Sequence, residues 1–319
     1  MKVIRRLHLL SGRRRRNESL DTRIPIYLRE ALLRQYGTVL AEKIAEGFAE
    51  DRPVTLRANT LKTSAEEVGS ILNAAGIVSE RIAWYSDAFL LPLATEDQIR
   101  ALAAYQDGKL YLQGLSPMIP ALLMPREPGL SLLDMCAAPG GKTTQLAALH
   151  QEKSDITACE RDPVRAERLR FNLSRQGVRR VTVLNTDARQ LDDMFRFDAI
   201  LLDAPCTGSG TIRVGEGVLA RRMTPEWVQK TVRTQTALIR KAAGLLKKGG
   251  ILVYSTCSIL EEENENQVRN ALRQGLDLIP VDAALRTALP ALPVSLAGTL
   301  CICPCSVCEG FFAAVLRKR

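Results

Sequence analysis

The 319-residue chain is predicted to fold as an α/β protein, with a doubly wound, mostly parallel sheet of seven strands and a smaller N-terminal α+β module. From residue 111 onward, short apolar runs alternate with segments of helical periodicity, which is the pattern of consecutive strand and helix units. A turn of small residues at 136–142 joins one apolar run to a helix, as in sheets that bind a ligand where their strands end. We therefore divide the chain into an N-terminal part, 1–110, and a larger part, 111–319.

The N-terminal part contains a run of four arginines, Arg13–Arg16, in a stretch with few acidic residues. Two interpretations of this run are open, a solvated helix face or arm and a surface that contacts phosphates. Apolar residues at helical spacing predict a helix over 25–50, and an apolar run predicts a strand over 54–57. Ser64 opens a second helix with a capping box, and further strands are expected up to residue 110.

Helices and strands alternate in the larger part. Asp162 followed by Pro163 predicts a capped helix start, and Gly177 predicts the end of that helix. Thr224 followed by Pro225 begins another helix in the same way. Strands are expected near 131–135, 156–160, 181–185, 198–202 and 251–255, with a final antiparallel pair near 299–305 and 311–316.

Composition and charge narrow the class of protein without deciding it. A hydrophobic content of 46% can build one large core or two unequal ones. The net charge of +9 suits a polyanionic partner, but it also suits any basic soluble protein. No run approaches the ~18 apolar residues of a membrane span, and the N-terminus lacks the long apolar core of a signal peptide. We therefore expect a cytoplasmic, monomeric protein without a membrane partner.

Eight cysteines in a cytoplasmic protein indicate packing or chemistry before disulfides. Four of them lie within eight residues, at Cys301, Cys303, Cys305 and Cys308. Zinc sites usually combine two separated cysteine pairs, and only Cys305 and Cys308 have the spacing of such a pair. We favour packing and predict no metal site, with a metal or redox role left open. If the segment is a strand, alternation places Cys301, Cys303 and Cys305 on one buried face.

The turn at 136–142 favours a cofactor that has a ribose and no diphosphate. A strand, a small-residue loop and a helix start expose backbone N–H groups to a ligand. Cys136 stands where the P-loop of an NTPase needs glycine, and Gly140 and Gly141 alone do not make a dinucleotide fingerprint. Glu160 ends the next predicted strand, about 20 residues downstream, where a carboxylate binds ribose hydroxyls. S-adenosylmethionine fits this pattern better than NAD or ATP.

Two further cysteines follow apolar runs that are typical of buried parallel strands. Cys206 follows the run 199–202, and Cys257 follows the run 251–254. The carboxyl ends of such strands meet at one edge of the sheet, so both thiols are expected in the same crevice. One thiol can attack an electrophile while the other helps the covalent adduct to break down. The alternative is that both are small buried side chains with a structural role.

Three motifs in this order resemble the RNA cytosine-5 methyltransferases of the Nol1/Nop2/Sun family, which includes bacterial 16S ribosomal RNA enzymes. They are Cys-Ala-Ala-Pro-Gly-Gly-Lys at 136–142, Asp-Ala-Pro-Cys at 203–206 and Thr-Cys-Ser at 256–258. The resemblance implies a class I methyltransferase, which is a Rossmann-like fold, with an N-terminal module that binds RNA. It covers most of residues 50–319, because it extends to 56–62, 111–117 and 309–312.

The resemblance implies transfer of a methyl group from S-adenosylmethionine to C5 of a cytosine in RNA, with ribosomal RNA as the first candidate and transfer RNA as the second. Cys257 would be the nucleophile that adds to C6, and Cys206 would assist release of the product. Asp203 would contact the base or the cofactor, and Lys142 would hold Asp203 or lower a thiol pKa. A catalytically silent RNA-binding protein of the same fold is the alternative, and the four intact residues argue against it.

The resemblance also implies cofactor contacts at the strand ends. Glu160 would bind the ribose and Asp187 the adenine amino group, with Arg165 as a weaker candidate and Asp203 nearby. The acidic run 261–265 is interpreted separately, as a helix start stabilised by the helix dipole. The backbone of the turn would surround the methionine end of the cofactor, and its residues are Cys136, Ala137, Ala138, Pro139, Gly140, Gly141 and Lys142.

Overall fold

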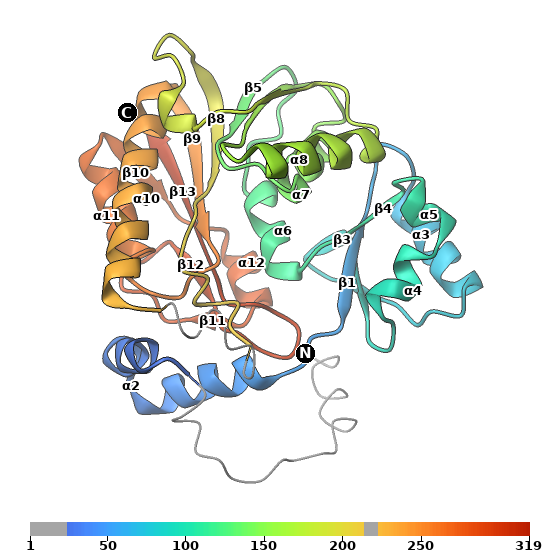
Figure 1. Ribbon diagram of the computed structural model, residues 1–319, viewed down its shortest axis with the longest axis horizontal. Coiled ribbons are helices and arrows are strands. Elements are labelled where there is room, and N and C mark those ends of the chain that lie inside the picture. Colours follow the sequence, from blue (N-terminus) through green and yellow to red (C-terminus); the bar gives the residue numbers. More distant parts are fainter. Residues whose placement is uncertain (1–23, 214–222) are drawn as a thin grey trace.

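The computed structural model describes residues 24–213 and 223–319, so the arginine run Arg13–Arg16 lies outside the described residues. Two sheets and the helices packed on them make up this described part of the molecule (Figure 1). Within the described part of the chain, no helix has the length and apolar character needed to cross a membrane.

A small antiparallel sheet carries the first part of the chain, in the strand order β2-β3-β1-β4. Apolar residues of α3, α4 and α5 pack on one of its faces. The N-cap of α3 is confirmed, because Glu67 N donates to Ser64 Oγ at 3.1 Å, but the predicted capping box is not closed, since the Glu67 carboxylate pairs with Lys109 instead. The elements are β1 (Val54–Ala58), α3 (Ala65–Ala74), β2 (Glu80–Ile82), β3 (Tyr85–Leu91), α4 (Glu96–Arg100), α5 (Ala103–Gln106) and β4 (Leu110–Leu112).

Within residues 24–213 and 223–319, the larger sheet has nine strands, in the order β11-β12-β13-β9-β8-β5-β6-β7, with β10 paired to β13. The neighbours from β7 to β9 are all parallel, whereas β13 is antiparallel to β9. The predicted doubly wound, mostly parallel fold is therefore confirmed. The strands are β5 (Ser131–Asp134), β6 (Asp155–Cys159), β7 (Val181–Leu184), β8 (Phe197–Asp203), β9 (Leu246–Thr256), β10 (Leu276–Ile279), β11 (Ala291–Leu292), β12 (Leu300–Ile302) and β13 (Phe311–Lys318).

The predicted count of seven strands is two too low, because β10 and β11 were not predicted. They have four and two residues, which is too short for an apolar pattern to stand out. β10 pairs with residues 315–318 of β13, and β12 pairs with residues 311–313. β10 and β12 thus pair with successive parts of one edge of β13, where the sequence predicts a single longer strand.

Helices cover both faces of the larger sheet. Residues of α2, α10 and α11 pack on one face, and residues of α6 and α7 pack on the other. The predicted start and end of α8 are confirmed, because Asp162 caps its first turn and Gly177 ends it with a φ of 73°. The helices are α2 (Ile26–Ala49), α6 (Leu115–Leu122), α7 (Gly141–Leu149), α8 (Pro163–Gln176), η2 (Ala188–Gln190), α10 (Pro225–Leu245), α11 (Glu265–Arg273) and α12 (Ala283–Ala288).

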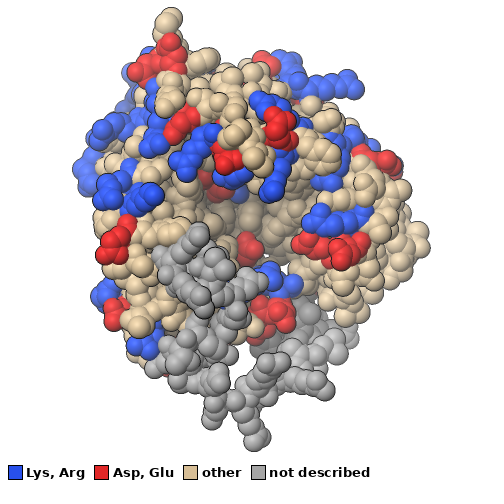
Figure 2. Space-filling view, in the orientation of Figure 1, with Lys and Arg blue, Asp and Glu red and all other residues tan. Residues whose placement is uncertain are grey.

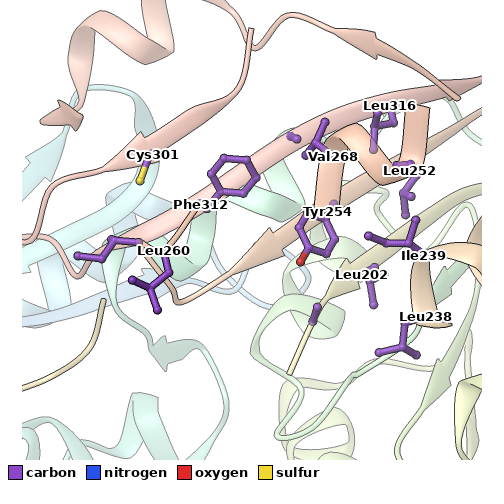
Figure 3. Close-up of a cluster of buried hydrophobic side chains, with 14 of the residues drawn as sticks. Leu202, Leu238, Ile239, Leu252, Tyr254, Leu260, Val268, Cys301, Phe312 and Leu316 are labelled. Atoms are coloured by element: carbon purple, nitrogen blue, oxygen red, sulfur yellow. The ribbon is translucent and has the colours of Figure 1, made fainter. Parts of the chain in front are cut away.

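Packing on the two faces fixes the central strands β8 and β9. Leu202 of β8 belongs to the cluster that includes α10 and α11, whereas the preceding Leu201 belongs to the cluster under α6. Figure 3 shows Tyr254 of β9 in the first cluster, between Leu202 and Phe312. The rings of Tyr254 and Phe312 meet edge to face, with centroids 6.4 Å apart. The carboxyl ends of these strands are therefore held by a close-packed core.

The small sheet packs against α6 and α7, which cover one face of the larger sheet near the predicted cofactor turn. Residues of β3, such as Tyr85 and Leu90, share a hydrophobic cluster with α6. Arg57 of β1 is wholly buried at this boundary. Its guanidinium donates to Gly141 O at 2.9 Å and to Thr144 Oγ1 at 2.7 Å, both in the first turn of α7. The small sheet thereby contacts the helix that follows the turn at 136–142.

Candidate active site

A cavity of about 240 Å³ lies where β5, β6, β7 and β8 end. This is the edge at which open α/β sheets bind ligands. Eight of the predicted site residues line it, and they come from segments that are up to 121 residues apart in the chain. They are Cys136, Ala138, Glu160, Arg165, Asp187, Asp203, Cys206 and Cys257.

Five of the predicted turn residues do not line the cavity: Ala137, Pro139, Gly140, Gly141 and Lys142. Gly140 has a φ of 105°, which favours glycine, and a Cβ there would lie 2.9 Å from Leu169 Cδ1 of α8, so that side chain would have to shift. Arg165 Nη2 donates to Ala138 O at 2.8 Å and so ties the turn to α8. Arg165 therefore has a structural contact in addition to its place at the cavity.

Two carboxylates border the cavity at the ends of β6 and β7. Glu160 is buried and accepts a hydrogen bond from Asp162 N at 2.9 Å, and Arg165 Nη1 lies 3.4 Å from its other oxygen. Asp187 forms an ion pair with Arg189 at 2.5 Å. The hydrogen bond from Arg189 holds the pKa of Asp187 below its usual value, although partial burial opposes this. Two fixed anionic groups thus face the same space.

Asp203 is held from two sides at the end of β8. Lys142 Nζ donates to one of its oxygens at 2.7 Å, and Ser255 Oγ donates to the other at 2.7 Å. Burial opposes the charge of Lys142, but Asp203 attracts that charge and raises the pKa of Lys142 overall. The ammonium also lies 5.6 Å from the ring centre of Phe311, within the range of a cation–π contact. Neither Ser255 nor Phe311 was predicted as part of the site.

The two thiols lie next to each other at the cavity, as the sequence predicts. Cys206 Sγ and Cys257 Sγ are 3.1 Å apart. The hydrogen bond with Cys257, together with burial, raises the pKa of Cys206 well above its ordinary value. Cys206 is therefore a protonated thiol that can donate to its neighbour.

Backbone and serine contacts lock the two thiol-bearing loops together. Ser209 Oγ and Ser258 Oγ are 2.8 Å apart, and Gly210 N donates to Cys257 O at 2.9 Å. Gly310 N in turn donates to Gly210 O at 2.8 Å. These residues were not predicted, and the available signal was the Gly-Ser-Gly run at 208–210, whose small residues allow backbones to approach closely.

Asp134 is a further buried residue beside the turn, and it was not predicted as part of the site. It ends β5, is buried, and accepts a hydrogen bond from Thr143 Oγ1 at 2.8 Å. Burial raises its pKa to about 6. An acidic residue at the end of an apolar run, directly before a small-residue turn, was the signal that could have identified it.

The cysteine cluster near the C-terminus divides between the two core clusters. Cys301 and Cys303 are buried with residues of α2, whereas Cys305 and Cys308 pack on the opposite side. The expectation that Cys305 shares a face with the first two is wrong, because β12 ends at Ile302 and strand alternation does not continue. In residues 24–213 and 223–319, no group of three His, Cys, Asp or Glu side chains is placed to hold a metal ion.

A mostly parallel sheet with two carboxylates, a small-residue turn and a thiol pair at its strand ends defines a protein of the class I methyltransferase type. The chain belongs to the family described as 16S rRNA methyltransferase RsmB/F, whose model matches residues 120–317. A second family model, described as an RsmF/B-like ferredoxin-like domain, matches residues 24–96. The motif resemblance to the Sun group of enzymes is thereby confirmed.

Curated relatives are named ribosomal RNA small subunit methyltransferase F. The protein from Vibrio parahaemolyticus is 35% identical over 310 residues, which cover 92% of this chain and 64% of the relative. The protein from Shewanella amazonensis is 36% identical over 272 residues, covering 83% and 58%. The chain thus spans about three-fifths of the length of these relatives.

Two similar solved structures come from Pyrococcus horikoshii. A methyltransferase homologue is 32% identical with a TM-score of 0.76, covering 92% of this chain and 99% of that one. A structure of NSun6 with SFG is 26% identical with a TM-score of 0.82, covering 93% and 99%. Both are similar to this chain over the small sheet as well as the large one, since the coverage leaves out few residues.

Proposed function

We propose that this chain is an S-adenosylmethionine-dependent methyltransferase that methylates C5 of a cytosine in RNA, with ribosomal RNA as the first substrate to test. The observation that carries the proposal is the thiol pair, Cys206 and Cys257, 3.1 Å apart at a cavity bordered by carboxylates. Relatives named as ribosomal RNA methyltransferases support RNA as the substrate. The relative solved with SFG supports a ligand site in this fold.

The groups around the cavity fit S-adenosylmethionine. Glu160 and Asp187 offer carboxylates for ribose hydroxyls and for the adenine amino group, and the backbone at Cys136 and Ala138 borders the same space. When bound, S-adenosylmethionine supplies an electrophilic methyl group. The arrangement contains neither a P-loop nor a dinucleotide glycine pattern, which agrees with a cofactor that lacks a diphosphate.

The residues of the site supply the remaining chemistry. Cys257, as a thiolate, forms a bond to C6 of the cytosine, and the electron pair of the C5–C6 double bond becomes available at C5 for methylation. Asp203, held by Lys142 and Ser255, lies at the same cavity and contacts the edge of the base. The C5 proton then passes to solvent water, and its bonding pair restores the C5–C6 double bond as the S–C6 bond breaks. Cys206 donates its proton to the departing sulfur of Cys257.

The first test is the variant Cys257→Ala. It is expected to lose methyl transfer while S-adenosylmethionine binding persists, because the thiol acts on the base. Tritiated methyl transfer to transcribed 16S rRNA and to transfer RNA measures activity, and bisulfite sequencing identifies the methylated position. Methylation of transfer RNA alone would move the substrate to that class. RNA binding without methylation by the natural chain would favour the silent RNA-binding protein, and an active Cys257→Ala variant would overturn the nucleophile assignment.

The partner variant Cys206→Ala separates attack from release. It is expected to accumulate a covalent protein–RNA adduct, because Cys257 still adds to C6 but no thiol assists its departure. Denaturing gels should show a shifted band that nuclease removes and that is absent from the double variant with Cys257→Ala. A Cys206→Ala protein that turns over normally without an adduct would contradict the two-thiol mechanism.

A further inference from the structure

Glu263 and Asn264 are consecutive buried residues that lie behind the two thiols, between β9 and α11. Both are inaccessible to solvent, and neither lines the cavity. The prediction that the acidic run 261–265 is a helix start stabilised by the helix dipole is wrong for Glu263, because α11 begins at Glu265. The carboxylate of Glu263 and the amide of Asn264 make specific contacts instead.

Glu263 holds the loop that carries Cys206. Its carboxylate accepts hydrogen bonds from Thr207 N at 2.9 Å and from Thr207 Oγ1 at 2.6 Å. Thr231 Oγ1 at 2.8 Å and Gln235 Nε2 at 3.1 Å, both on α10, complete a set of four donors. A buried carboxylate is tolerated when donors of this kind replace its water.

Both chain neighbours of Cys206 are fixed by this arrangement. Thr207, on one side, is bound by Glu263, and Pro205 O, on the other, accepts a hydrogen bond from the same Gln235 Nε2 at 3.0 Å. The backbone on both sides of Cys206 is therefore held in place. Glu263 is also tied to the other thiol-bearing strand, because Tyr254 OH of β9 donates to Glu263 O at 2.6 Å.

Asn264 holds the chain neighbours of Cys257 in the same way. Thr256 Oγ1 donates to Asn264 Oδ1 at 2.6 Å, and Asn264 Nδ2 donates to Ser258 O at 2.9 Å. Thr256 and Ser258 are the two chain neighbours of Cys257. Adjacent residues thus fix the flanks of the two thiols, one thiol each.

We propose that the Glu263–Asn264 pair is a positioning device that sets the separation of the two thiols, with Glu263 placing Cys206 and Asn264 placing Cys257. The proposal rests on the two-thiol function proposed above. In this proposal Glu263 supports the release step by placing Cys206, and Asn264 supports the attack step by placing Cys257. The two residues act through Thr207 and through Thr256 and Ser258, and they do not touch the substrate.

The separation can be measured without RNA or cofactor by disulfide formation. Diamide removes two electrons and two protons from a pair of thiols, which join as a disulfide while diamide becomes the hydrazine. Mass spectrometry of peptides then gives the rate at which Cys206 and Cys257 are joined. In the natural chain this reaction is expected to be fast, because the sulfur atoms are 3.1 Å apart. Glu263→Gln and Asn264→Ala are each expected to slow it by about tenfold, the effect of losing about one hydrogen bond to a charged or buried group.

Thr231→Val and Glu262→Gln keep the test decisive if a buried substitution impairs folding. Thr231→Val removes one of the four donors to Glu263 without changing the carboxylate. It should therefore also slow disulfide formation, but by less than Glu263→Gln does. Glu262→Gln changes the neighbouring, partly exposed carboxylate and should leave the rate unchanged. Equal rates in Glu263→Gln, Thr231→Val and Glu262→Gln would overturn the role of Glu263.

Turnover with RNA separates this proposal from the one on which it rests. Glu263→Gln should accumulate the protein–RNA adduct, as Cys206→Ala does, whereas Asn264→Ala should form less adduct than the natural chain. General loss of stability cannot produce opposite effects in adjacent residues. If Cys257→Ala stays active, the proposed function fails. If Cys257→Ala is inactive and Cys206→Ala traps RNA, but both positioning variants match Glu262→Gln, only the positioning proposal fails.

Discussion

Asp134 is a carboxylate that the fold encloses at the end of β5, directly before the cofactor turn. It is 1% exposed, and burial raises its pKa to about 6 from an ordinary value of 3.8. The unfolded chain therefore loses this proton at lower pH than the folded chain does. Between about pH 4 and pH 6 the folded state binds more protons, so its stability falls as pH rises through that window.

Asp134→Asn is expected to remove this part of the pH dependence. The amide keeps the size of the side chain and still accepts from Thr143, but it carries no charge at any pH. The natural chain should lose up to about 3 kcal/mol of unfolding free energy from this group between about pH 4 and pH 7, and the variant should not. Urea denaturation across that range measures the difference. Asp155→Asn, at an exposed carboxylate, is the control, and identical pH profiles for the natural chain and Asp134→Asn would contradict the prediction.

The sequence predicted residues that end strands more readily than residues that support them. Cys206 and Cys257 follow apolar runs, so the meeting of the thiols could be predicted from the rule that parallel strands end at one edge. Ser255 holds Asp203 across the β8–β9 pair. Phe311 reaches Lys142 from β13, more than 160 residues further along the chain. Such contacts depend on strand order, which no local pattern encodes.

At the scale of elements, the start of β13 is joined to the thiol loops by two glycines in direct contact. A Cβ on Gly210 would lie 2.2 Å from Gly310 O, closer than any side-chain atom can approach. Gly310 N donates to Gly210 O, and Gly210 N donates to Cys257 O. Position 210 therefore requires glycine for space, and it transmits the position of β13 to the loop of Cys257.

Gly210→Ala is expected to destabilise the chain by about 1–3 kcal/mol and to reduce methyl transfer, because the two backbones must separate. Gly244→Ala is the matched control. Gly244 lies in α10, and a Cβ there meets nothing within 4 Å, so alanine should stabilise the helix by about 0.5–1 kcal/mol. Urea denaturation measures both variants. Gly210→Ala with the stability of Gly244→Ala would show that the close contact has no energetic role.

Elements with a cap or stop in the sequence were predicted well, and elements formed by tertiary pairing were not. α8 runs from Pro163 to Gln176, between the predicted signals Asp162 and Gly177. α2 covers Ile26–Ala49, close to the predicted 25–50, although its kink at Gly37 was not predicted. β10 and β11 exist because the edge of the sheet offers them partners. Their own sequences are too short to indicate a strand.

At the scale of the whole molecule, the two sheets are joined by a buried cation that makes no ion pair in the described part of the chain. Arg57 donates to Gln113 Oε1, Gly141 O and Thr144 Oγ1 and lies over the ring of Tyr111. It therefore links the small sheet to the start of α7. The division at residue 110 stays a prediction, as do the monomeric state and the cytoplasmic location.

Basic residues outnumber acidic residues by nine, 44 against 35. Figure 2 shows Lys and Arg side chains spread over the upper part of one face, with Asp and Glu among them. Several arginines of the described chain have acidic partners, such as Arg180 with Asp155 and Arg170 with Glu167. The net charge therefore favours a polyanionic partner in general. It does not identify which segment of the chain binds that partner.

Replacing Arg13–Arg16 by serine tests whether this run contacts RNA. If the arginines bind phosphates, the variant should bind RNA more weakly, and the slope of log K against log salt should flatten by up to about 0.7 per lost contact on a single strand or 0.9 on a duplex. Affinity for S-adenosylmethionine should not change, because the proposed cofactor residues lie between 136 and 203. Dissociation constants of both proteins across a range of salt concentrations measure the slopes. Equal slopes would assign the run to solvated surface. Arginines that do not contact phosphates release no counterions on binding, so removing them does not change the salt dependence.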